Sequence, residues 1–278
     1  MSVGVFLAVL VAALLHASWN ALVKFGEDKV SGMFMLSVAH AILAVPLILI
    51  SPFPAPEVWP WLLGSGLIHF AYQAFLMLAY QHGDLSRVYP IARGTAPMIV
   101  LVFSAVFLSD QLRSVEVGGI LLVGLGILLM ARGVFTQGEE RRLLPFALGS
   151  AAATAGYSIV DGLGARVAGD ATQYLGWLMV ISGVLFTTIT LFWKGTAPAR
   201  VPLGHWARGF VAAAFSLLAY WIAVWAMTVA PIALVTALRE TSVLFAVLIG
   251  IVFFGEKSDR GKFLAAVLIV AGVMATRI

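Results

Sequence analysis

The stretches Ile91-Ala92-Arg93-Gly94-Thr95 and Ala237-Leu238-Arg239-Glu240-Thr241 carry an arginine and a threonine at the same spacing, 146 residues apart (239 − 93 = 146). The same shift superimposes Gly126 on Gly272. Each arginine lies deep in an apolar stretch that is long enough to be a membrane helix. A cation at that depth costs several kcal/mol unless it pairs or faces a wet cavity. The sequence therefore predicts two repeats that each carry a guanidinium into the bilayer, with a solute site at the interface between them.

The composition indicates an integral membrane protein. The 278 residues are 62% hydrophobic and only 11% charged, whereas a soluble domain carries about 25% charged residues. The basic residues behind the net charge of +4 lie almost entirely between apolar segments. This placement indicates membrane topology and contact with the lipid bilayer, and no nucleic-acid partner is expected. The absence of cysteine excludes disulfides and thiolate metal sites.

Ten apolar segments have about the length that a membrane-spanning helix requires. They are approximately Val3–Val23, Val30–Ile50, Val58–Tyr80, Ser86–Leu108, Val115–Ala131, Leu144–Ala165, Thr172–Trp193, His205–Val229, Ile232–Phe254 and Lys262–Thr276. The first segment lacks a basic leader and is expected to be a retained helix. The charged run Gly138-Glu139-Glu140-Arg141-Arg142 is the expected joint between a first repeat, 1–137, and a second, 138–278. Five spans per repeat is an odd number, so the fold expected is all-α with two inverted five-helix repeats.

The distribution of lysine and arginine predicts the orientation. Twelve of these residues fall in connections on one side of the expected bundle, and only Arg113, Arg166 and Arg277 fall on the other. The positive-inside rule places the first group in the cytoplasm and both termini outside. The expected location is a bacterial-type inner membrane, crossed several times.

Two motifs carry a resemblance to a known family. They are His16-Ala17-Ser18-Trp19-Asn20-Ala21-Leu22-Val23-Lys24 and Ala237-Leu238-Arg239-Glu240-Thr241-Ser242, and an acidic residue, Asp110 or Glu256, closes each half. The chain resembles ten-helix, EamA-type members of the drug/metabolite transporter superfamily over essentially its whole length. The resemblance implies solute transport by alternating access from a cavity lined by helices 1, 3, 4, 6, 8 and 9. Members of that family carry amino acids, nucleotide sugars, choline or drugs, so the substrate stays open.

Several intramembrane polar and aromatic side chains are candidates to line the cavity, each with a structural alternative. Arg93 either binds solute or braces the bundle, and Glu240 is either a counter-ion of an arginine or a cation ligand. Trp221 and Trp225 either line a cavity, where aromatic rings attract ammonium groups, or pack against neighbouring helices. The expected substrate-binding set is Arg93, Arg239, Glu240, Trp19, Asn20, Tyr72, Gln73, Tyr80, Tyr89, Tyr157, Asp161, Trp221 and Trp225. For proton coupling the candidates are Glu240, His16 and His40, although a lone intramembrane histidine often only makes an interhelical hydrogen bond.

The function expected from these features is secondary transport of a small polar metabolite. Arginines suit a carboxylate or phosphonate, and aromatic rings with Glu240 or Asp161 suit an ammonium, so a zwitterionic amino acid or aminophosphonate-like solute fits best. A carrier of cationic amines or drugs is the alternative, and a lipid-modifying membrane enzyme is a third class. The sequence contains no P-loop and no zinc-ligand spacing, so neither cofactor nor metal is expected. Other expected partners are a coupling proton or another ion, and the protein is expected to be a monomer or a homodimer.

Overall fold

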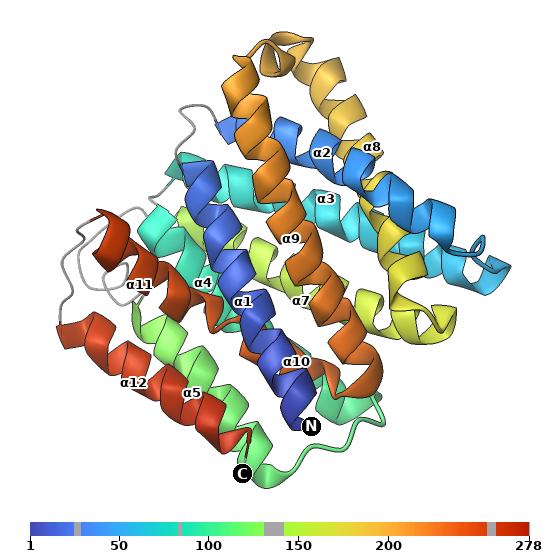
Figure 1. Cartoon of the computed structure of the whole chain (residues 1–278). Helices are drawn as coiled ribbons and strands as arrows, with labels where there is room; N and C mark the ends of the chain where they lie inside the picture. Colours follow the sequence, from blue (N-terminus) through green and yellow to red (C-terminus); the bar gives the residue numbers. More distant parts are fainter. Residues whose placement is uncertain (25–28, 83–84, 131–141, 255–259, 278) are drawn as a thin grey trace.

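The computed structural model describes residues 1–24, 29–82, 85–130, 142–254 and 260–277, and within these ranges the chain is helical with no strand (Figure 1). The first repeat contains α1 (Val3–Lys24), α2 (Lys29–Ile50), α3 (Trp59–His82), α4 (Leu85–Phe107) and α5 (Ser114–Met130). The second contains α7 (Leu143–Ala168), α8 (Ala171–Lys194), α9 (Leu203–Val229), α10 (Ile232–Arg239), α11 (Ser242–Phe254) and α12 (Arg260–Ala275). Short 3-10 turns at Pro56–Val58 and Ala197–Ala199 precede α3 and α9.

Length and composition allow six of the described segments to cross a membrane: Val3–Leu22, Val30–Ile50, Leu143–Ala168, Ala171–Lys194, Leu203–Val229 and Ile232–Val252. Three shorter apolar helices accompany them. Together with α3, and with α10 and α11 counted as one helix, each repeat has five helices, as predicted.

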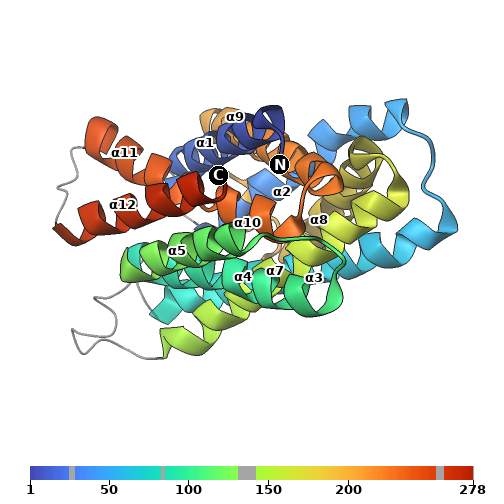
Figure 2. The same ribbon diagram turned by 90° about the horizontal axis from the view of Figure 1, so that it is seen from below.

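The helix packing follows the two-fold relation between the repeats. Helix α3 packs along α7, and its counterpart α9 packs along α1. Helix α4 also contacts α7, just as α11 contacts α1. The remaining counterparts pack on each other, α2 on α8 and α5 on α12, and the latter pair lies side by side in both views (Figures 1 and 2). The two termini meet at one end of the bundle, where Arg277 Nη1 donates to the Met1 carbonyl at 3.2 Å.

Glycines allow α5 and α12 to approach closely where they cross. A Cβ atom at Gly119 would lie 2.7 Å from the Gly272 carbonyl oxygen, and one at Gly126 would lie 3.0 Å from the Ala265 carbonyl oxygen. The shift of 146 residues relates Gly119 to Ala265 and Gly126 to Gly272. The repeat symmetry therefore exchanges the two contacts, and backbone-to-backbone packing of small residues holds this crossing together.

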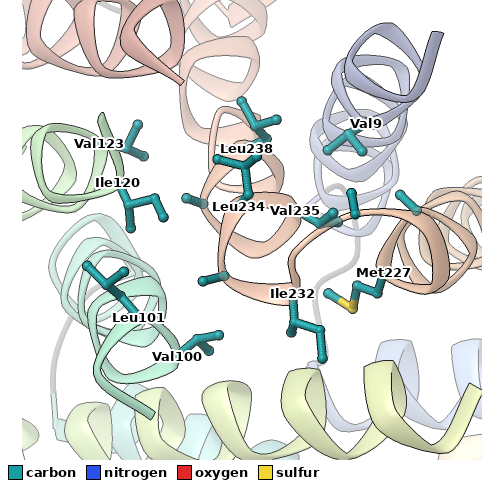
Figure 3. Close-up of a cluster of buried hydrophobic side chains, with 14 of the residues drawn as sticks. Val9, Val100, Leu101, Ile120, Val123, Met227, Ile232, Leu234, Val235 and Leu238 are labelled. Atoms are coloured by element: carbon teal, nitrogen blue, oxygen red, sulfur yellow. The ribbon is translucent and has the colours of Figure 1, made fainter. Parts of the chain in front are cut away.

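Helix α10 lies at the centre of the largest apolar cluster (Figure 3). All of its residues are buried. Its Leu234 and Leu238 are packed in one cluster with Val100 of α4 and Ile120 of α5, while Val9 approaches from α1. A short helix packed on all sides is a rigid support for the residues at its end.

The ninth span differs from the continuous helix expected over Ile232–Phe254. Glu240 and Thr241 form a turn between α10 and α11, in which the Glu240 N–H donates to the Ala237 carbonyl at 3.2 Å and the Thr241 N–H to the Leu238 carbonyl at 3.1 Å. The Thr241 hydroxyl also donates to the Leu238 carbonyl, at 2.7 Å. These i to i+3 bonds are of the 3-10 type, and such mid-helix stretches often mark functional positions. The interruption places Arg239 and Glu240 at the join, as in the discontinuous helices of many transporters.

Candidate solute site

Arg93 and Glu240 meet near mid-membrane. Arg93 lies eight residues after the start of α4, and Glu240 eight after the start of α10. At 1.5 Å per residue each is about 12 Å from its helix end. In the inverted-repeat fold those two ends lie on opposite faces of a hydrocarbon core roughly 30 Å thick. Both side chains are therefore close to the middle of the bilayer.

These two residues form an ion pair across the repeat interface. The distance from Arg93 Nε to Glu240 Oε2 is 2.7 Å, and the side chains are only 2% and 1% exposed. Removing one partner of such a pair would leave a buried charge without compensation, which costs about 3–5 kcal/mol. The pair holds α4 against the turn between α10 and α11.

Arg239 has a different environment. Its guanidinium carbon lies 5.0 Å from the centroid of the Tyr220 ring, a cation–π contact. The residue is 7% exposed. Within the part of the chain that the structure describes, no acidic oxygen lies within ion-pair distance of it. Its charge therefore faces an aromatic ring instead of a carboxylate.

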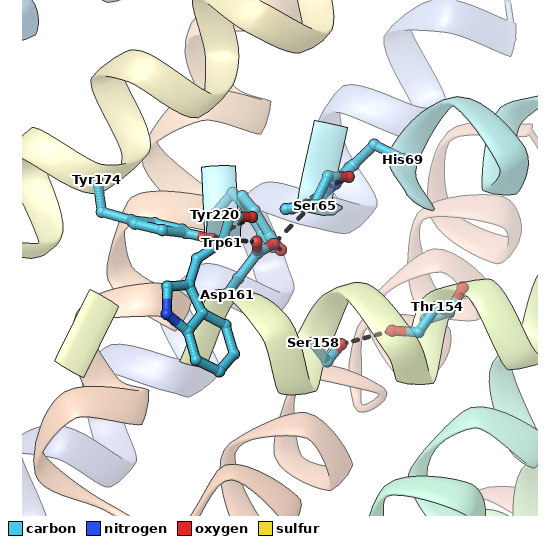
Figure 4. Close-up of polar contacts among 8 residues, drawn as sticks. All are labelled: Trp61, Ser65, His69, Thr154, Ser158, Asp161, Tyr174 and Tyr220. Atoms are coloured by element: carbon cyan, nitrogen blue, oxygen red, sulfur yellow. Dashed lines mark hydrogen bonds and ion pairs between the residues drawn. The ribbon is translucent and has the colours of Figure 1, made fainter. Parts of the chain in front are cut away.

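Asp161 is the second buried acid of this region, and neutral hydroxyl groups surround it (Figure 4). The Tyr174 hydroxyl donates to Oδ1 at 3.0 Å, and the Tyr220 hydroxyl donates to Oδ2. His69 Nε2 lies 3.9 Å from Oδ2, too far for a hydrogen bond. The Asp161 side chain is 0% exposed. Tyr220 therefore connects the two centres, since its hydroxyl contacts Asp161 and its ring contacts Arg239.

Aromatic rings form a wall beside Asp161. His69 stacks on Tyr157 with ring centroids 4.3 Å apart and planes at 23°. Tyr72 and Tyr220 meet the same Tyr157 ring edge to face, at 5.6 and 6.1 Å. His69 is held by Ser65, whose hydroxyl and carbonyl lie 3.1 and 3.0 Å from Nδ1. The wall combines side chains of α3, α7 and α9.

A glycine in α7 makes room for Tyr174. A Cβ atom at Gly164 would lie 2.5 Å from Cε2 of the Tyr174 ring and 2.7 Å from its hydroxyl oxygen. Because α8 can approach α7 this closely, the Tyr174 hydroxyl reaches Asp161, which lies three residues earlier on α7. Real Cβ atoms do not approach other atoms at such distances, so only glycine fits here.

The structure brings part of the predicted set together in this centre, namely Arg93, Arg239, Glu240, Asp161, Tyr72 and Tyr157. Trp221 is near it but is occupied, since its Nε1 donates to Thr172 Oγ1 at 3.1 Å. Trp225 is partly buried and packs against two apolar clusters. Gln73 has a buried Oε1 with no hydrogen-bond partner among the described residues.

The remaining predicted residues make no described contact with Asp161 or fall outside the described side chains, and His16 lies within electrostatic range of Arg93 and Arg239. Within α1, Trp19 Nε1 donates to His16 Nδ1 at 3.3 Å, and Asn20 Nδ2 donates to the His16 carbonyl at 2.8 Å. His40 lies midway along α2, and its buried Nε2 has no hydrogen-bond partner among the described residues. The side chains of Tyr80 and Tyr89 fall outside the described part of the chain.

The predicted set omitted three residues that contact or approach the Asp161 carboxylate. His69 shares a helical stripe with Tyr72 and Gln73, and this spacing could have included it. Tyr220 precedes Trp221, and the match of Ala71-Tyr72 to Ala219-Tyr220 between the repeats pointed to it. Tyr174 comes from α8, which is the seventh span and so is not one of the helices expected to line the cavity, and nothing in its local sequence indicates its role.

A polar clamp closes the end of the bundle that holds the termini. Arg166 forms a bidentate pair with Asp110, at 2.8 and 3.1 Å. The same guanidinium donates to the carbonyls of Met227 and Ala230, at 2.9 and 3.1 Å. Asp110 Oδ2 also accepts from the backbone N–H of Ile232 at 2.9 Å. The clamp thus joins the α4–α5 connection, the end of α7, the end of α9 and the start of α10.

Comparisons with known proteins agree with this architecture. The EamA-like transporter family matches residues 3–132 and 142–278. The comparison with curated proteins gives no match. A solved structure described as "Crystal structure of protein" superimposes with a TM-score of 0.74 at 17% identity, covering 99% of this chain and 96% of the other, and this likeness concerns the fold alone. The family match extends over nearly the whole sequence, so the chain belongs to the EamA-like transporter family, whose members are multi-pass membrane transporters of small solutes.

Proposed function

We propose that this protein is a secondary transporter that moves a small zwitterionic solute, such as an amino acid or aminophosphonate, by alternating access. The observation that carries the proposal is the charge content of the centre. Two cations, Arg93 and Arg239, and two anions, Asp161 and Glu240, are buried together where the repeats meet. Intramembrane charges of this kind usually mark a substrate or ion pathway.

The balance of these charges favours a zwitterion over a simple ion. Four buried groups with no net charge would be unbalanced by a solute carrying only a positive or only a negative charge. A zwitterion adds one charge of each sign, and each can lie beside its opposite. A bulky apolar solute would leave the arginine and aspartate without partners.

A cationic amine is the second candidate, because Asp161 and the rings of His69, Tyr157 and Tyr220 would suit an ammonium group. The nearby Arg239 opposes it, since its positive charge lies over the same Tyr220 ring. A lipid-modifying enzyme is the least supported class. Arg93 and Glu240 lie near mid-bilayer, whereas lipid head groups and scissile ester bonds lie at the interface.

Reconstitution would test the proposal. Purified protein in proteoliposomes should take up a radiolabelled short amino acid or 2-aminoethylphosphonate saturably, and preloading with unlabelled solute should accelerate entry by counterflow. Uptake with and without a pH gradient would show whether a proton is coupled. Uptake that rises linearly with concentration and shows no counterflow would refute a carrier, and transport restricted to amines would select the second candidate.

The location proposed for the protein is a bacterial-type inner membrane, with both termini on the outer side.

A further inference from the structure

The four buried charged residues have different partners, and these partners indicate which residues bind the solute. This inference rests on the proposed transport function. Arg93 and Glu240 are engaged with each other at 2.7 Å. Arg239 and Asp161 contact only neutral partners among the described residues, and both contact the same tyrosine. We infer that Arg239 binds the carboxylate or phosphonate of the solute and Asp161 its ammonium, while Arg93–Glu240 is an internal pair that binds no solute.

Arg239 has the capacity to bind an anion. A guanidinium carries five N–H donors in a planar fork and accepts no hydrogen bond. The cation–π contact with Tyr220 uses the positive charge of the guanidinium group and none of its N–H groups as hydrogen-bond donors. Guanidinium N–H groups therefore remain for an oxyanion. Carboxylates and phosphonates match the fork with two parallel hydrogen bonds.

Asp161 has the complementary capacity to bind an ammonium. A carboxylate offers about four lone-pair positions, and the hydroxyls of Tyr174 and Tyr220 occupy one on each oxygen. The aromatic rings of Tyr157, Tyr220 and His69 lie beside it, and aromatic faces attract ammonium groups. The buried Asp161 carboxylate receives hydrogen bonds only from neutral donors and contacts no cation among the described residues. A solute ammonium would provide a positive charge to compensate its burial.

Tyr220 sets the distance between the two ends. Its ring centroid is 5.0 Å from the Arg239 guanidinium carbon, and its hydroxyl bonds Asp161. Adding the length of the phenol and one hydrogen bond gives roughly 7–10 Å between the guanidinium carbon and the carboxylate oxygen, depending on the angle. An α-amino acid with a hydrogen bond at each end spans about 9–10 Å by the same bond lengths. An α-amino acid already reaches the upper end of this range, so the site favours zwitterions with one or two carbons between the charged groups, and longer ω-amino acids in an extended conformation exceed the span.

Arg93 and Glu240 serve a different purpose. Their ion pair holds α4 against the interruption between α10 and α11. A buried ion pair can be replaced by apolar side chains of similar volume without loss of folding. The double substitution Arg93→Met/Glu240→Met therefore removes both charges at once and isolates their role in binding.

Calorimetry on purified full-length protein tests the assignment. The probes are β-alanine and 2-aminoethylphosphonate as zwitterions, propionate and ethylphosphonate as acids, and ethylamine. Asp161→Asn should weaken both zwitterions about ten- to a hundredfold, the usual range for one charged hydrogen bond, and change the acids less than about threefold. Arg239→Gln should weaken zwitterions and acids alike and spare ethylamine. The Arg93→Met/Glu240→Met variant should stay within about tenfold of wild type for β-alanine.

The outcomes separate the assignment from the proposed function. Loss of β-alanine binding in a monodisperse Arg93→Met/Glu240→Met variant, or equal weakening of zwitterions and acids in Asp161→Asn, would overturn the assignment while transport of zwitterions could stand. Wild-type protein alone provides a check that needs no folded variant. Equal affinity for β-alanine and 5-aminopentanoate would contradict the Tyr220 spacing, and binding of no short zwitterion at all would refute the proposed function itself.

Discussion

Replacing Gly164 with alanine probes the packing that builds the Asp161 environment. The added Cβ would lie 2.5–2.7 Å from Cε2, Cζ and the hydroxyl oxygen of Tyr174, a side chain with no exposed surface. The ring is stiff and its hydroxyl is fixed on Asp161 at 3.0 Å, so it has little freedom to move aside. Either α7 and α8 separate, or Tyr174 withdraws from the carboxylate.

The expected loss follows from three terms. Overpacking a well-packed site costs about 1–3 kcal/mol. Withdrawal of the tyrosine hydroxyl from a buried carboxylate adds about 1.5–3 kcal/mol. Alanine recovers about 1 kcal/mol relative to glycine inside a helix. The net expectation is a destabilisation of about 1.5–5 kcal/mol, with Gly164→Ala melting lower by several degrees.

Gly156 is the matched control on the same helix. A Cβ atom there would first meet Ile68 Cγ2 at 3.5 Å, which is ordinary van der Waals contact. Gly156→Ala should therefore melt at or slightly above the wild-type temperature. Thermal unfolding of the two variants in one detergent, followed by tryptophan fluorescence, gives the comparison. Equal melting temperatures would show that Tyr174 does not occupy the position described and would remove the physical basis for its bond to Asp161.

Three further predictions concern the scaffold and its orientation. Gly119→Ala should destabilise the α5–α12 crossing, because its Cβ would lie 2.7 Å from a carbonyl oxygen. Gly118→Ala should not, because a Cβ at that position has open space. Equal melting temperatures of the two variants would contradict the close approach of α5 and α12. Asp110→Asn should lower the melting temperature by weakening a charge-assisted pair worth about 1.5–3 kcal/mol, and an unchanged melt would mean that the clamp adds nothing. Single cysteines at Ser2 and at Thr196, introduced into a chain without cysteine, should react with an impermeant thiol reagent in intact cells at position 2 only; labelling at 196 alone would invert the topology.

The class of fold could be predicted because its signals are additive along the sequence. Long apolar segments, charged separators and the shift of 146 residues can each be recognised without knowing how the helices pack. The two-fold packing of α5 on α12 and α2 on α8 agrees with that prediction. The turn at Glu240 could not be foreseen, because neither Gly nor Pro occurs there and Thr241 and the Arg93 contact become effective only in the packed bundle.

The candidate site was predictable in its charges but not in their pairing. Burial of an arginine in lipid is costly enough to identify Arg93 and Arg239 from sequence alone. Which acid each one meets depends on how α4, α7 and α10 cross, and the alternatives for Glu240 therefore stayed open. Tyr174 is the clearest example of a contact that the sequence does not predict. Its hydrogen bond to Asp161 requires the space left by Gly164 on the neighbouring helix α7.

Helix α10 connects the central charges to the clamp at the end of the bundle. The first N–H of α10, at Ile232, bonds Asp110, and its last residue is Arg239, about 10 Å away along the helix axis. All of its residues are buried against apolar neighbours, so the helix moves as a unit or not at all. A ligand can shift a conformational equilibrium only through different affinities for the two states. If opening of the end that holds the Asp110–Arg166 pair also displaces α10, an anion bound at Arg239 would change the stability of that pair. If α10 stays in place, it would not.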